Sequence, residues 1–96
     1  MTGPAKAFPD AGGVEGWHVH GEGAGASFRA PSLLTAAQFV QAVAALADDF
    51  GEAPEIDLRA HGVTVRLPDR THVELARQVS ALARELDLPA DPSLLG

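Results

Sequence analysis

Two histidines stand one residue apart, at His18 and His20, a spacing that places both imidazoles on one face of a β-strand. Paired imidazoles can begin a metal site, because neutral imidazole is a common metal ligand. No third ligand is evident, since the chain has no cysteine and His61 falls in an expected turn. The polar face of an exposed sheet explains the pair equally well. We therefore expect no metal and no cofactor.

Two other motifs give only weak evidence for a binding site. The glycines that lie between residues 21 and 25 do not match a phosphate-binding loop, because no strand–loop–helix context with a lysine follows them. We interpret Gly21–Gly25 as a turn. Asp48 and Asp49 fall at the expected C-terminal end of a helix, where negative charge is unfavourable to the helix dipole. A functional role and a solvated charge both remain open for them.

Four short segments alternate apolar and polar residues, which predicts four strands. They are Trp17–His20, Ala26–Ala30, Ile56–Arg59 and Val63–Leu67. The last two are separated only by Ala60-His61-Gly62, a connection typical of a β-hairpin. Because each strand has one apolar and one polar face, the pattern favours an antiparallel sheet that is covered on one side.

Two segments repeat apolar residues at helical spacing, which predicts helices at Thr35–Phe50 and Thr71–Leu86. Each begins with the S/T-x-x-E/Q spacing of a capping box, formed by Thr35 with Gln38 and by Thr71 with Glu74. The order β-β-α-β-β-α predicts an α+β fold, a four-stranded antiparallel sheet with two helices packed on one face. The expected core includes Phe39, Val43, Val65, Leu75, Val79 and Leu82.

Length and charge limit the class of protein. The 96 residues suffice for one domain, which we expect at 16–92, with a flexible arm at 1–15 and a tail at 93–96. The net charge of −6 argues against nucleic acid as a partner. No apolar run approaches the ~20 residues that span a bilayer, and no apolar region marks a secretory signal, so we expect no membrane partner and a cytoplasmic protein. So small a core favours self-association.

The order and spacing of several motifs resemble the pterin-4a-carbinolamine dehydratases. Gly16-Trp17 opens the first strand, and the first helix runs into a Pro-acid-strand junction at Pro54-Glu55. A hairpin then leads to a last helix that contains Val73-Glu74-Leu75-Ala76. The resemblance covers roughly Gly16 to Pro92. It implies the same α+β fold, a homodimer or homotetramer, and a pterin-like cyclic ligand.

The resemblance also locates candidate site residues. The family's His-His-Pro motif aligns with Glu52-Ala53-Pro54, and its third histidine has no counterpart in the shorter loop after Leu67. Glu52 and the nearby His72 are therefore the candidate catalytic residues. The resemblance places five candidate ligand-binding residues around them, namely Trp17, Asp48, Pro54, Glu55 and Asp69.

Three functions are compatible with this pattern. The loss of the proton-transferring histidines favours a dehydratase-like protein without efficient dehydratase activity, which acts as a small-ligand-binding or protein assembly module. The second is an enzyme of altered chemistry, of lyase type, on another small cyclic substrate of secondary metabolism. The third is a residual 4a-hydroxytetrahydrobiopterin dehydratase.

Overall fold

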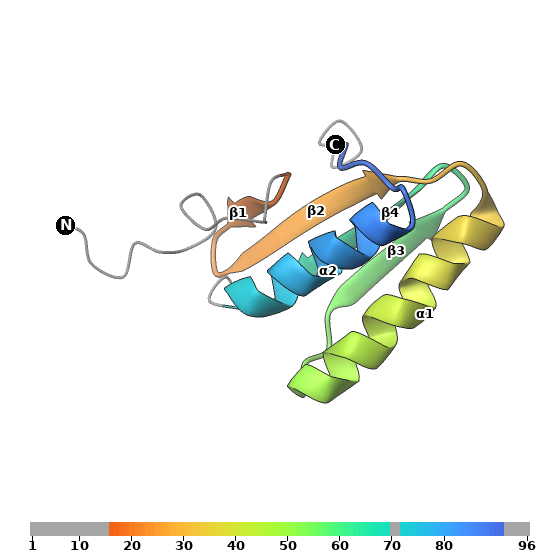
Figure 1. The fold of residues 1–96 in the computed structure, drawn as a ribbon. Helices are drawn as coiled ribbons and strands as arrows, with labels where there is room; N and C mark the ends of the chain where they lie inside the picture. Colours follow the sequence, from red (N-terminus) through yellow and green to blue (C-terminus); the bar gives the residue numbers. More distant parts are fainter. Residues whose placement is uncertain (1–15, 70–71, 92–96) are drawn as a thin grey trace.

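The computed structural model describes residues 16–69 and 72–91 and confirms the order and type of the expected elements. The strands are β1 (His18–His20), β2 (Gly23–Arg29), β3 (Glu55–Arg59) and β4 (Gly62–Leu67), and the helices are α1 (Leu33–Phe50) and α2 (Val73–Glu85). All pairings are antiparallel, in the order β1-β2-β4-β3, and both helices cover one face of the sheet (Figure 1). The expected arm at 1–15 and tail at 93–96 lie outside the described residues.

Strand register decides which side chains meet the helices. In the central pair, Ala26 lies opposite Val65 and Phe28 opposite Val63, and all four side chains are buried in the core. The intervening residues point to the other face, where Gly25 lies opposite Arg66 and Ser27 opposite Thr64. We call this second surface, which the helices do not cover, the open face.

The first turn is shorter than the sequence indicated. Only Gly21 and Glu22 form it, and the residues from Gly23 onward belong to β2, so the prediction of a turn over Gly21–Gly25 was wrong. Glycine at position 23 permits close strand approach, because a Cβ atom there would lie 2.5 Å from the carbonyl oxygen of Leu67. Gly23 therefore serves strand pairing rather than chain reversal.

The capping box predicted at Thr35 was misplaced. Helix α1 begins at Leu33 because Ser32, in extended conformation, is the N-cap, and its Oγ accepts a hydrogen bond from the Thr35 amide at 3.1 Å. Helix α2 begins at Val73 after His72, whose side chain makes no capping hydrogen bond. Thr71 lies outside the described residues. The expected end of α1 is confirmed, since Gly51 adopts the left-handed conformation with φ 70°.

The core lies between the sheet and the helices. Phe28 links the two layers, with its ring centroid 5.3 Å from that of Phe39 on α1 and 6.4 Å from that of Trp17. Five of the six expected core residues are buried. The exception is Leu82, which is only partly buried because it lines a groove between α1 and α2. Its side chain packs against the core cluster but is not among the buried residues.

The chain segment after α2 returns to the sheet. The Arg29 amide donates to the Pro89 carbonyl and the Asp91 amide to the Ser27 carbonyl, each at 2.8 Å, and the Arg29 and Asp91 side chains form an ion pair. This segment lies beside the end of β2 that β1 does not reach. Strand β3 forms the opposite edge of the described sheet. Neither described helix combines the length and apolar character that crossing a membrane requires.

Candidate functional site

Three candidate residues meet at one end of the sheet. The Nδ1 atom of His72 lies 3.2 Å from Oε1 of Glu52, and its Nε2 atom lies 4.0 Å from Oδ2 of Asp69. Glu52 comes from the loop after α1, where its amide donates to the Ala47 carbonyl at 2.9 Å. Asp69 and His72 come from the connection between β4 and α2. The fold therefore brings together two loops that lie about 20 residues apart in the chain. We call these three residues the acid–histidine cluster.

The hydrogen-bonding capacity of the His72 imidazole is only partly used. Nδ1 is a buried atom without a hydrogen-bond partner, because its 3.2 Å approach to Glu52 lacks the geometry of a hydrogen bond. The His72 and Glu52 side chains are about a quarter exposed, at 27% and 23%. Imidazoles exchange protons near neutral pH and carboxylates can orient them. The cluster thus holds the groups that acid–base chemistry requires.

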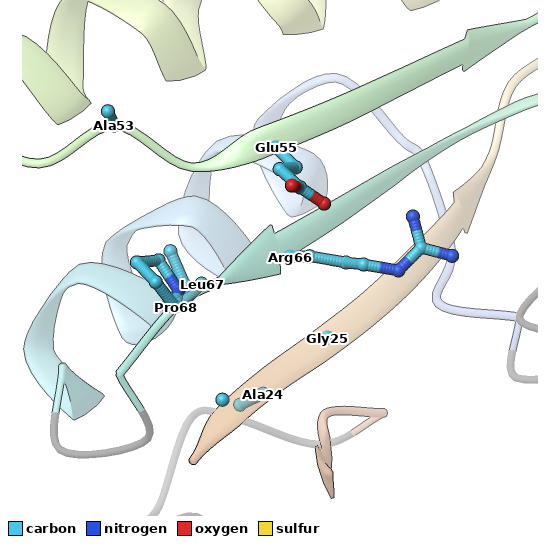
Figure 2. Close-up of a pocket in the computed structure, with 8 residues that line it drawn as sticks. Ala24, Gly25, Ala53, Glu55, Arg66, Leu67 and Pro68 are labelled. Atoms are coloured by element: carbon cyan, nitrogen blue, oxygen red, sulfur yellow. The ribbon is translucent and has the colours of Figure 1, made fainter. Parts of the chain in front are cut away.

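The structure also contains a hollow of about 500 Å³, whose lining residues are drawn in Figure 2. Its described lining comes from three parts of the chain: the start of β2, the junction before β3, and the end of β4. The residues are Gly23, Ala24, Gly25, Ala53, Glu55, Arg66, Leu67 and Pro68. Ala53 and Pro68 adjoin Glu52 and Asp69 in sequence, so the hollow and the acid–histidine cluster share the same two loops.

Two side chains of opposite charge stand in this lining. Glu55 lies opposite Arg66 in the β3–β4 register, and Arg66 lies opposite Gly25 in the β2–β4 register. Figure 2 shows the Arg66 side chain running over β2, away from Glu55. Both side chains are exposed. The described lining therefore offers one cationic donor and one anionic acceptor above a backbone surface.

The remaining candidate residues are placed differently. Trp17 is 7% exposed and belongs to the core, where its Nε1 donates to Ser80 Oγ at 2.8 Å. Asp48 is exposed on the last turn of α1, and Pro54 is half-buried before β3. Of the five candidate ligand-binding residues, Glu55 is the one found among the described lining of the hollow.

Sequence reasoning did not single out Arg66 or the glycines at 23 and 25. A signal was present, because Arg66 occupies the polar face of a predicted strand. Its neighbours on that face follow only from the pairing of β2 with β4, which joins residues about 40 positions apart. Among the described residues, no group of three or more His, Cys, Asp or Glu side chains is arranged to hold a metal ion.

Comparisons with known proteins identify a similar structure. No protein-family model matches the chain. No curated protein sequence matches it either. A crystal structure of a transcriptional coactivator/pterin dehydratase from Brucella melitensis is similar to it, with a TM-score of 0.64 and 25% sequence identity. The match covers 73% of this chain and 84% of that one. The chain therefore has the fold of a pterin dehydratase-like protein, as the sequence resemblance implied.

Proposed function

We propose that this pterin dehydratase-like protein binds a small cyclic, pterin-like ligand in the hollow and does not dehydrate it efficiently. The observation that carries the proposal is the lining itself, in which Glu55 and Arg66 stand over backbone and small residues while the described lining contains no histidine. Glu52 and Ala53 occupy the positions that align with the two adjacent histidines of the resembled family. Ligand contacts are thus supported, whereas proton transfer at this surface is not.

The size and chemistry of the hollow fit a small ligand. Small-molecule sites usually measure 300–1,000 Å³ and combine apolar walls with a few polar groups that fix orientation. The hollow measures about 500 Å³ and has this composition, with the exposed residues Ala53 and Pro68 beside the two charged side chains. A protein assembly partner would instead favour a flatter and more extended surface.

Filling the hollow is expected to abolish ligand binding. Ala53 is exposed and lines the hollow, so Ala53→Phe places a ring where the ligand would lie. Ala45→Phe is the matched control, because Ala45 is exposed on α1 and away from the hollow. Titration calorimetry with tetrahydrobiopterin and 7,8-dihydrobiopterin under anaerobic conditions should give saturable binding to wild type and Ala45→Phe only. Absence of binding to wild type would contradict the proposal.

A second candidate function is an enzyme of altered chemistry on a small cyclic substrate. The acid–histidine cluster favours it, since the buried Nδ1 atom of His72 lies 3.2 Å from Glu52 without a hydrogen bond. Such a group is available to a substrate proton if the neighbouring loops admit the substrate. Residual dehydratase activity would depend on the same imidazole.

We further propose that the protein is a homodimer or homotetramer. Strand β3 forms an edge of the described sheet, and exposed sheet edges tend to pair with other chains. Leu58 on β3 is 41% exposed, and Leu33 and Leu34 at the start of α1 are 56% and 70% exposed. Burial of these leucines in a second copy would remove apolar surface from water.

Light scattering at micromolar concentration is expected to give at least twice the monomer mass. Leu58→Lys should lower the average mass, because it places a charge on the β3 edge. Glu22→Lys alters charge in the β1–β2 turn, near the opposite edge, and should leave the mass unchanged. A monomer mass for the wild-type chain would refute self-association.

A further inference from the structure

We infer that the ligand of the hollow carries a carboxylate, which Arg66 binds, together with an edge of N–H donors, which Glu55 binds. This inference rests on the proposed ligand-binding function and adds the chemical class of the ligand. A neutral ring would leave the guanidinium without a partner in the complex. A flat heterocycle that bears one carboxylate substituent would match both charges.

The unpaired state of the two charges is the first support. Glu55 and Arg66 face each other across β3 and β4, a position in which opposite charges usually pair. Within residues 16–69 and 72–91, neither side chain has a hydrogen bond or an ion pair. Figure 2 shows the guanidinium directed over β2 instead. Both groups therefore flank the hollow with their bonding capacity free.

The neighbouring arginines behave differently, which is the second support. Arg29 forms an ion pair with Asp91, and Arg59 donates from Nε to Asp57 Oδ1 at 3.1 Å. The hydrogen bond that Arg59 donates to Asp57 raises the pKa of Arg59. Arg66 differs from these two arginines on the described open face, because its side chain lines the hollow. Arg29 and Arg59 are paired with carboxylates that are not among the described lining residues.

The shape of the surface argues for a flat ligand. At Gly23 and Gly25 the strand presents backbone rather than side chains to the hollow. A Cβ atom at position 23 would lie 2.5 Å from the Leu67 carbonyl oxygen, so this position has no room for a larger residue. A planar ring can lie against such a surface while its edge reaches Glu55, since a carboxylate accepts two parallel N–H bonds.

The charge balance also excludes polyanions as ligands. Glu55 stands in the same hollow as Arg66, and the chain carries a net charge of −6. A nucleic acid needs several clustered cations to neutralise its phosphates. In the part of the lining that the structure describes, one guanidinium opposite one carboxylate instead selects a small molecule with one anionic group and one donor edge.

Two probes that share a ring separate these contributions. Pterin-6-carboxylate carries the carboxylate, and 6-methylpterin has the same donor edge without it. Fluorescence titration should give about tenfold or tighter affinity for pterin-6-carboxylate, because hydrogen bonds to charged groups are the stronger ones. Arg66→Ala should abolish this preference and leave 6-methylpterin binding unchanged. Glu55→Ala should weaken both probes to a similar extent.

Arg59→Ala is the control, because Arg59 is exposed on the same face but outside the described lining. It should retain the preference, and all variants should keep the wild-type thermal unfolding midpoint. Equal affinity of the wild type for both probes, or a preference that survives Arg66→Ala, would overturn the inference and leave the binding function intact. Failure of both probes to bind would overturn the inference and the proposed function together.

Discussion

The purified protein is expected to leave the dehydration of 4a-hydroxy-tetrahydropterin close to its uncatalysed rate. The reaction expels a hydroxyl group and removes a ring proton, and each well-positioned acid or base contributes about 10²–10⁴-fold. The sequence resemblance aligns Glu52 and Ala53 with two histidines of the dehydratase family, and alanine exchanges no proton. In the described lining of the hollow, the ionisable side chains are Glu55 and Arg66. Neither side chain carries the imidazole group that suits proton exchange near neutral pH.

A coupled assay with a phenylalanine hydroxylase measures this directly. Turnover near that of an authentic dehydratase would contradict the expectation, and loss of that turnover in His72→Ala would assign it to the acid–histidine cluster. Gln78→Ala is a suitable control, because Gln78 is exposed on α2, the helix that follows His72. Restoring the histidines with Glu52→His and Ala53→His tests the same reasoning from the other side, since activity should then rise.

Most of the fold could be predicted from the sequence because its signals are local. The alternation in Val63–Leu67 and the apolar stripe through Phe39 and Val43 each report one buried face. Element boundaries were less certain, because several residues compete for one role. Ser32 and Thr35 can both cap α1, and only the extended backbone at Ser32 decides between them.

The candidate site could be predicted only in part, because its residues meet through tertiary pairing. Glu52, Asp69 and His72 were named individually, and the contact of His72 with Glu52 depends on the packing of two loops. The juxtaposition of Gly25, Arg66 and Glu55 depends on the register of three strands. A one-residue shift in that register would move every side chain to the opposite face. Sequence periodicity indicates which face of an element a residue occupies, but not which residues of other strands lie beside it. The hollow could therefore not be predicted from the sequence.

Phe39→Ala is expected to have the largest effect on stability among the substitutions considered. The Phe39 side chain is 0% exposed, and its ring packs edge-to-face against Phe28 at 5.3 Å. Truncation of a buried phenylalanine costs about 3–5 kcal/mol, through lost transfer energy and the remaining cavity. Because domains are stable by only about 5–15 kcal/mol, the variant should be folded marginally or not at all.

Phe50→Ala provides a matched control on the same helix, since the Phe50 side chain is 39% exposed. We expect it to cost well under half as much as Phe39→Ala, because far less apolar surface and no buried ring pair are lost. Trp17 is the single tryptophan and is buried, so its fluorescence reports unfolding in urea. Protein concentration must be held constant, because the proposed self-association would add concentration-dependent stability. Equal unfolding free energies for the two variants would contradict the placement of Phe39 at the centre of the helix–sheet interface.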